Sequence, residues 1–411
     1  AGIHDARIVS GHHGALGATG GGKSWTTARI IEECLRYKTK IILLDATGEY
    51  RGFDGEHVSN LHLGAPVSTA KSSAPCSLPH TSFMESDFIA LFEPAGKVQG
   101  PKLRAAIRSL RLATLAPHVA TGGIIKKIDQ SKVPILTEEA KAGIAEKLDD
   151  PQQAFDVWKL VSQIEQECVY PDGFGVARGS KDTTKWGGDS GEVSYCLSLM
   201  SRISGILSSS SFDCVFKSKA PALTESISSF VSNEDRLLRI CLSGVAFEFK
   251  AREIIANVIG RHLLNMARDG AFKSCPVVVI VDEAHNFLGR HIGADDVVAR
   301  LDAFELIAKE GRKYGLNICL STQRPRDITE GVLSQMGTLV VHRLTNDRDR
   351  EVVERACGEI DRSASSFLPN LKPGEAAIIG ADFPIPLTIQ VFPPSAKPFS
   401  DGPNYQTHWK V

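Results

Sequence analysis

Short apolar runs alternate with longer segments of helical periodicity in two parts of the chain. Near the beginning, a strand predicted at His13–Leu16 runs into a glycine-rich turn, and a helix predicted at Ser24–Tyr37 precedes the strand Lys40–Asp45. The alternation returns later, in the strand Leu237–Leu242, the helix Lys250–Arg268, the strand Pro276–Asp282, the helix Val297–Lys313 and the strands Leu316–Ser321 and Thr338–His342. This pattern predicts an α/β fold with a parallel sheet covered by helices on both faces.

The segment between these two parts has a different pattern. From about residue 55 to 235, Pro and Ser are frequent, and helical stretches such as Pro101–Leu115 and Thr137–Leu148 replace the apolar strands. We therefore predict one α/β domain in two parts, residues 1–54 and 236–384, interrupted by a mainly helical insertion at 55–235. Past Pro384 the chain is rich in proline, which predicts an extended C-terminal arm over residues 385–411.

Composition narrows the class of protein. The 411 residues are 42% hydrophobic and 23% charged, as in globular proteins, which excludes disorder and collagen. The longest aliphatic run, Val277–Val281, is far shorter than the ~20 residues of a membrane-spanning helix. Nine scattered cysteines without a Cys-x-x-Cys spacing argue against a zinc site or a redox pair and favour a reduced, cytoplasmic compartment. The net charge of −1 indicates that any contact with nucleic acid must be local.

A phosphate-binding motif follows the first predicted strand. The segment from Gly17 to Ser24 fits G-x-x-x-x-G-K-[ST] and opens a helix, as the mechanism of a P-loop requires. Its glycines let backbone N–H groups turn toward phosphates, its lysine reaches the β- and γ-phosphates, and its serine hydroxyl binds Mg²⁺. A glycine-rich turn that binds nothing is the alternative. The predicted nucleotide-binding residues are Gly17, Thr19, Gly20, Gly21, Gly22, Lys23, Ser24 and Trp25.

A second motif supports nucleotide hydrolysis. Val277–Val281 reads as a buried strand and ends in Asp282 and Glu283, the pattern of a Walker B segment. We expect Asp282 to hold Mg²⁺ together with Ser24, and Glu283 to orient and deprotonate the attacking water. Two carboxylates that merely cap a strand end are the alternative. The two motifs together predict an ATPase that uses ATP and Mg²⁺.

Gln323 distinguishes this site from small P-loop kinases and GTPases. It follows the strand Leu316–Ser321, and the tips of parallel strands converge on the ligand, so its side chain can report the presence of the γ-phosphate. An ordinary polar residue at a strand end is the alternative. Glu283, the acid directly after Asp282, is typical of ATPases that activate water. Its presence disfavours the alternative of a small-molecule kinase.

The ordered motifs resemble those of the HerA family of the HerA–FtsK superfamily. They are Gly17–Ser24, Leu44–Tyr50, Asp282–Phe287, Glu310–Gly315, Ser321–Pro325 and Gly374–Ala376. The resemblance implies a RecA-like P-loop ATPase core that assembles as a hexameric ring and translocates double-stranded DNA. It also implies a partner, either a NurA-like nuclease or a sirtuin-like or nuclease effector of antiphage defence.

Two departures from the family pattern change what can be carried over. Family members usually have His in Asp-Pro-His-Gly-Glu-Tyr, whereas Thr47 stands at that position here, so no role of that imidazole applies. Family members also begin with a β-barrel domain of roughly a hundred residues or more. Only about a dozen residues precede the P-loop strand. The chain is then either part of a longer protein or binds its partner through other surfaces.

Arg312 is the candidate for a residue that acts on a neighbouring subunit. In ring ATPases an arginine supplied in trans stabilises the charge of the transition state. Arg312 lies near the C-terminal end of the predicted helix Val297–Lys313, in a Gly-flanked segment. A basic residue favourably placed at a helix C-terminus is the alternative. Arg324 and Arg343 are competing candidates. Glu49 either organises the water and metal shell or forms a strand-end ion pair.

Basic residues without acidic neighbours predict the DNA contacts. Between Pro94 and Ile128 the chain carries seven Lys and Arg residues and no acid, and Arg104, Arg108 and Arg111 follow helical spacing on one face. A second candidate is Arg290, in a glycine-flanked segment after the Walker B motif. Phosphate contact is one interpretation, and a solvated helix face or a surface turn is the other.

Two functions therefore remain open from the sequence. The first is an ATP-driven ring that translocates double-stranded DNA and works with a nuclease or a defence effector. The second is an ATP-binding oligomeric scaffold that assembles and regulates an effector, with little or no DNA transport.

Overall fold

The computed structural model describes residues 11–399 except 19, 68, 171–181, 289, 293–298, 357–366, 381 and 382. Thr19 of the phosphate-binding motif lies outside the described residues, and so does the side chain of Arg290. One large sheet dominates the described part of the chain, in the strand order β14-β13-β12-β1-β11-β8-β2-β7-β3-β4. From β12 to β4 neighbouring strands are parallel, whereas β13 and β14 join antiparallel at one end.

The strands of this sheet confirm the predicted α/β fold. They are β1 (His12–Leu16), β2 (Lys40–Asp45), β3 (Val58–Gly64), β4 (Ala74–Pro75), β7 (Leu237–Gly244), β8 (Val277–Val281), β11 (Leu316–Thr322), β12 (Met336–Val341), β13 (Glu375–Gly380) and β14 (Phe383–Gln390). Two small antiparallel pairs lie elsewhere, β5 (Val169–Tyr170) with β6 (Gly187–Gly188) and β9 (Arg290–Ile292) with β10 (Ala299–Leu301).

Helices bury both faces of the central strands. On one face, α1 (Lys23–Leu35) places Ala28 and Ile31 against Ile41, Leu43 and Ile280. On the other face, α10 (Ala251–Arg268) and α11 (Ala303–Glu310) pack against alternate residues of the same strands. Because β2 and β8 are covered on both sides, they are continuous apolar runs, as expected of central parallel strands.

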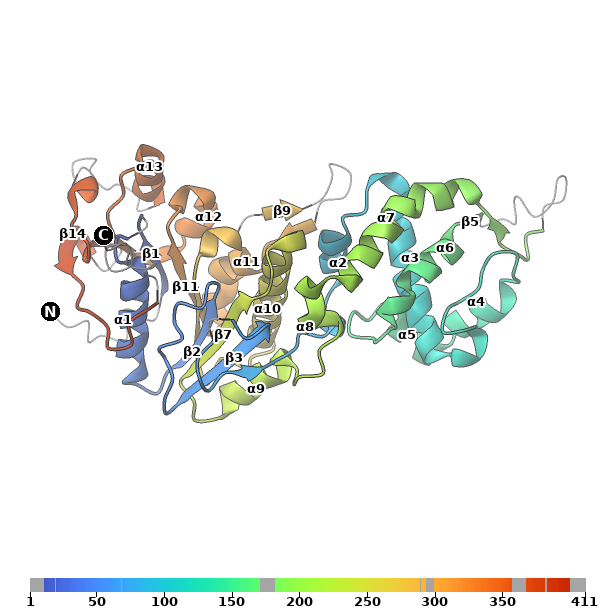
Figure 1. Cartoon of the computed structure of the whole chain (residues 1–411), viewed down its shortest axis with the longest axis horizontal. Helices are drawn as coiled ribbons and strands as arrows, with labels where there is room; N and C mark the ends of the chain where they lie inside the picture. The colour runs from blue at the N-terminus through green and yellow to red at the C-terminus, as the bar shows by residue number, and fades with distance from the viewer. Residues whose placement is uncertain are drawn as a thin grey trace, which may run out of the picture.

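The helical segment forms the other end of an elongated molecule (Figure 1). Its helices are α2 (Glu85–Phe92), α3 (Gly96–Leu115), α4 (Val133–Glu139), α5 (Ala142–Leu148), α6 (Leu160–Glu167) and α7 (Ser190–Ser208). The chain then returns to the sheet through α8 (Asp213–Phe216) and α9 (Leu223–Ser232), where Lys40 Nζ of β2 donates to Phe230 O. The short helices α12 (Glu330–Leu333) and α13 (Asp347–Ala356) lie with the sheet. Buried Asp87 of α2 joins the two ends, because it accepts hydrogen bonds from Asn257 and Arg261 of α10.

Four predicted segments differ from the structure. Val58–Gly64 lies inside the predicted helical insertion, yet it pairs with β7 in the main sheet. Its apolar pattern is broken by Asn60 and His62, whose burial is made possible by hydrogen bonds to Phe53 O and Ser73 Oγ. Residues 383–390, predicted as an extended arm, form the edge strand β14, a position where prolines are tolerated.

The predicted helix Val297–Lys313 was also too long. Its first residues include β10, α11 begins at Ala303, and a 3₁₀ turn covers Gly311–Tyr314. A Cβ at Gly311 would come within 2.5 Å of Leu316 O, so this tight turn into β11 requires glycine. The stretch predicted as one helix at Thr137–Leu148 is broken between α4 and α5.

Candidate nucleotide-binding site

The phosphate-binding loop connects β1 to α1 at the carboxyl edge of the sheet. Gly20 and Gly22 have φ of 75° and 110°, a region that favours glycine, and Gly22 caps the start of α1. A Cβ at Gly17 would come within 2.5 Å of His342 Cβ, so the loop can approach β12 only with glycine there. These conformations leave the start of α1 open to an anion.

Three predicted residues meet at this loop. Lys23 Nζ donates to Glu283 Oε1 at 3.2 Å, and Gln323 Nε2 donates to Glu283 Oε2 at 3.2 Å. Lys23 comes from α1, Glu283 follows the end of β8, and Gln323 follows the end of β11. Residues 300 positions apart in the sequence meet in one cluster because their parallel strands end at the same edge of the sheet.

Glu283 has an uncommon backbone conformation. Its φ of 48° lies in the left-handed region, and this turn presents its carboxylate to Lys23 instead of to solvent. Nδ1 of His285 lies 3.2 Å from the second carboxylate oxygen and 3.2 Å from Thr322 Oγ1. Glu283 is thus held at both oxygens, a suitable starting position for a base that must point at one water.

Asp282 is almost completely buried, with 1% of its surface exposed. The Tyr50 hydroxyl donates to its Oδ1 at 3.3 Å, whereas Oδ2 is buried without a hydrogen-bond partner. Burial raises the pKa of Asp282 to about 7, against the opposing effect of Lys23. Burial acts to lower the pKa of Lys23, but Asp282 and Glu283 outweigh it and raise that pKa. A buried carboxylate oxygen without a partner fits the predicted Mg²⁺ site.

Ser24 and Trp25, the other predicted ligand residues of α1, are both half-buried in its first turn. Ser24 is the second residue of α1, directly after Lys23. At this position its hydroxyl and Asp282 could together hold Mg²⁺. The ring of Trp25 faces the C-terminal segment instead, because Lys397 Nζ lies 6.0 Å from its centroid.

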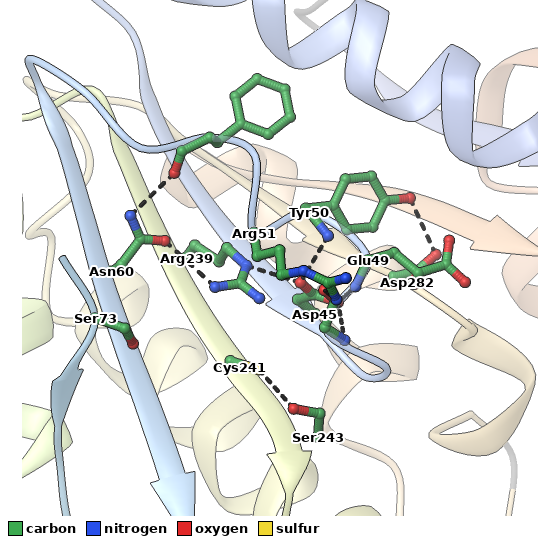
Figure 2. A network of polar contacts seen from close by, with 12 residues as sticks. Asp45, Glu49, Tyr50, Arg51, Asn60, Ser73, Arg239, Cys241, Ser243 and Asp282 are labelled. Carbon is green, nitrogen blue, oxygen red and sulfur yellow. Dashed lines mark hydrogen bonds and ion pairs between the residues drawn. The ribbon is translucent and has the colours of Figure 1, made fainter. Parts of the chain in front are cut away.

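A buried ion pair supports the loop beside Asp282 (Figure 2). Asp45, at the end of β2, accepts the backbone N–H groups of Gly48, Glu49 and Tyr50 at 2.7–3.1 Å. Arg239 of β7 donates to its second oxygen at 2.7 Å, and neither side chain is exposed. The loop is thereby fixed in the position that lets Tyr50 reach Asp282. We did not predict Arg239, although an arginine inside the apolar strand Leu237–Leu242 was an available signal.

His342 supports the phosphate-binding loop from β12 and was not predicted either. Its Nδ1 lies 2.9 Å from Glu375 O, which can only accept, so Nδ1 carries the proton and Nε2 accepts the Thr26 hydroxyl at 2.7 Å. Burial lowers the pKa of His342 to about 4, so the ring is neutral at pH 7. No sequence motif marked this histidine.

Arg312 does not belong to the same cluster. It lies in the 3₁₀ turn before the amino end of β11, whereas Lys23 and Gln323 follow the carboxyl ends of β1 and β11. Its side chain is exposed. Any role of Arg312 at a nucleotide must therefore be on another copy of the chain. The competing Arg343 and Arg324 lie at the loop itself, since Arg343 O accepts Ala18 N–H and Arg324 directly follows Gln323.

The predicted DNA-binding stripe on α3 is only partly present. Arg111 is 9% exposed and donates to Leu148 O and Pro151 O, so it stabilises the helical segment and does not face solvent as predicted. Arg104 pairs with Glu85 and Arg108 with Asp149. Glu85 and Asp149 lie before and after residues 94–128 in the sequence. The absence of acids within that range therefore did not indicate unpaired arginines.

Comparisons with known proteins agree with this geometry. Residues 1–160 match a family model described as the central domain of helicase HerA. A "DNA double-strand break repair helicase HerA" of Saccharolobus solfataricus is 22% identical over 97% of this chain and 67% of that protein. The chain is thus similar to HerA helicases, and the family model covers fewer than half of its residues.

Other relatives match over shorter regions. A HerA of Pyrococcus furiosus with the same description is 34% identical over 28% of this chain. The matching region spans 20% of that relative's length. The range matched by the family model, residues 1–160, includes the phosphate-binding loop.

Solved structures with a similar fold include two of the bacterial conjugative coupling protein TrwBΔN70. The unbound monoclinic form has a TM-score of 0.51 at 14% identity and covers 94% of this chain and 85% of that chain. The trigonal form with sulphate has a TM-score of 0.52 at 15% identity and covers 95% and 87%. The fold of this chain is thus the RecA-like P-loop fold. In the described ranges, every helix is too short or too polar to span a bilayer.

Proposed function

We propose that this chain hydrolyses ATP with Mg²⁺. The observation that carries the proposal is the convergence of Lys23, Glu283 and Gln323 on the phosphate-binding loop. Phosphate oxygens compete with Glu283 for Lys23, so nucleotide binding would release one oxygen of Glu283 to accept a proton from water. Ser24 and Asp282 would hold Mg²⁺, which supplies charge stabilisation at the phosphates. Gln323, still on the other oxygen, would keep Glu283 oriented.

We further propose that copies of the chain form a hexameric ring that moves double-stranded DNA and works with a nuclease or a defence effector. The printed description of the HerA relatives as DNA repair helicases supports this function. The exposure of Arg312 on the edge opposite Lys23 supports a ring, because one copy could then supply an arginine to the next. Arg104, Arg108 and Arg290 are the candidate phosphate contacts.

The test is the rate of ATP hydrolysis with and without long duplex DNA at low salt. We expect stimulation by DNA in the wild type and hydrolysis reduced by at least about 100-fold in Glu283→Gln, which keeps the shape of the side chain but removes the base. Glu305→Gln is the matched control, since the one ion pair of Glu305 among the described residues is with exposed Lys309 at the next turn of α11. Hydrolysis unaffected by Glu283→Gln would refute the assigned mechanism.

One observation favours the alternative of an ATP-binding scaffold that regulates an effector. The arginines expected to contact DNA are engaged by Glu85, Asp149 and backbone carbonyls, so phosphate binding by Arg104 or Arg108 must first displace an acid. A scaffold predicts that DNA leaves hydrolysis unchanged and that Glu283→Gln still forms the complex with its partner. A motor predicts stimulation by DNA.

A further inference from the structure

Glu49 brings a second carboxylate without a partner to the nucleotide site. Its Oε2 is buried and accepts no hydrogen bond, and Glu49 forms no ion pair among the residues that the structure describes. Figure 2 shows its side chain next to that of Asp282, whose Oδ2 is also buried without a hydrogen bond. The charge of Glu49 contributes to raising the pKa of both Asp282 and Lys23, so it acts on both residues of the site.

The backbone of Glu49 is fixed on two sides. Its N–H donates to Asp45 Oδ1 at 3.1 Å, and its carbonyl accepts the N–H of Phe399 at 2.8 Å. The next residue, Tyr50, is fully buried and bonded to Asp282. Arg51 stacks on the Phe399 ring, with its guanidinium carbon 3.9 Å from the centroid. The carboxylate is therefore presented by a built turn and not by a loose surface loop.

Among the described residues, two carboxylates of the site form no ion pair within 4 Å, and Lys23 only partly offsets the charge of Asp282. Lys23 pairs with Glu283 at 3.2 Å, and Arg239 pairs with Asp45 at 2.7 Å. Asp282 and Glu49 remain, and both place an oxygen in a region sheltered from solvent. Two neighbouring buried acids are costly unless a cation joins them. A divalent cation matches both the charge and the preference for oxygen ligands.

We propose that Glu49 positions the divalent cation of the nucleotide site by accepting a hydrogen bond from a water in its coordination shell, while Asp282 and Ser24 lie closer to the metal. This inference rests on the proposed function and adds a residue to it. Carboxylates that hold metal ligands from outside the coordination shell typically change metal affinity 10–100-fold when removed. Glu49 is thus a positioning residue, which acts on the phosphates through the cation.

The test measures Mn²⁺ binding by electron paramagnetic resonance, with a non-hydrolysable ATP analogue bound to the full chain. We expect Glu49→Gln to weaken Mn²⁺ binding about tenfold, while the affinity for the analogue in EDTA stays unchanged. The thermal midpoint without metal should be unchanged or higher, because the substitution removes repulsion with Asp282 and no hydrogen bond to Oε2. Glu56→Gln, an exposed carboxylate seven residues away, is the matched control and should behave as wild type.

Three results would separate the possible failures. Equal Mn²⁺ affinity in Glu49→Gln and Glu56→Gln would overturn the role of Glu49. A lower thermal midpoint with weaker analogue binding in EDTA would also overturn it, since both indicate a structural role. Asp282→Asn is the test of the site itself: unchanged Mn²⁺ binding there would overturn the proposed Mg²⁺-dependent function, whatever Glu49 does.

Discussion

Arg239 Nε donates to Asp45 Oδ2 at 2.7 Å, and both side chains are completely buried. The pair connects β7 to the loop after β2, which in turn delivers Glu49 and Tyr50 to the nucleotide site. A buried pair of this kind often contributes little net stability compared with apolar residues. Its main consequence here is the conformation of the loop, because Asp45 must stay charged and in place to accept three N–H groups.

Replacement of Arg239 tests this relationship. Arg239→Met leaves Asp45 as an uncompensated buried charge, and we expect a loss of about 3–5 kcal/mol in the free energy of unfolding. Arg36→Met is the matched control, because Arg36 is 62% exposed and pairs with Glu33 on the surface, so its loss should cost less than about 1 kcal/mol. Urea denaturation of both variants measures the difference. Equal effects would show that the buried pair does not hold this part of the fold.

The neutral histidine behind the phosphate-binding loop predicts a dependence of stability on pH. Burial lowers the pKa of His342 from 6.5 to about 4, so between these values the unfolded chain binds a proton that the folded chain does not. Stability should therefore fall as the pH drops from 6.5 toward 4, by up to about 3 kcal/mol from this residue.

His342→Gln provides the measurement for this prediction. Its amide can replace both hydrogen bonds without a proton to gain, so the fall in unfolding free energy between pH 6.5 and 4 should be smaller than in the wild type. Burial also lowers the pKa of His12 to about 4 and lowers the pKa of His62, His80, His262 and His285, so part of the fall should persist in His342→Gln. An identical pH profile in wild type and His342→Gln would contradict the prediction.

Mixed oligomers test whether Arg312 acts on a neighbouring copy. Arg312→Ala chains keep Lys23, and Lys23→Ala chains keep Arg312, so a mixed ring contains some interfaces with both residues intact. We expect each variant alone to lose at least about 1,000-fold in ATP hydrolysis, and the mixture to recover measurable activity. Complete inactivity of mixed oligomers, with mixing verified by mass, would exclude Arg312 as the residue supplied in trans.

The sheet was predictable because its central strands are buried on both faces and are therefore continuous apolar runs. The site was predictable where one short motif fixes the chemistry, as at Lys23, Ser24, Asp282 and Glu283. β3 was missed because its buried Asn60 and His62 are satisfied by partners in loops outside the strand, Phe53 and Ser73. Arg111 was assigned wrongly because its carbonyl partners, Leu148 O and Pro151 O, lie 37 and 40 residues further along the chain. Arg239 and His342 act only through contacts across the sheet, which no local pattern reports.

In the proposed function, ATP hydrolysis moves the protein along double-stranded DNA. Displacement of a third strand from a DNA triplex, followed over time with ATP and Mg²⁺, measures this movement directly. We expect displacement by the wild type that requires ATP and is absent in Lys23→Ala. A wild-type protein that hydrolyses ATP yet never displaces the third strand, with or without its native partner, would contradict the motor and favour the scaffold.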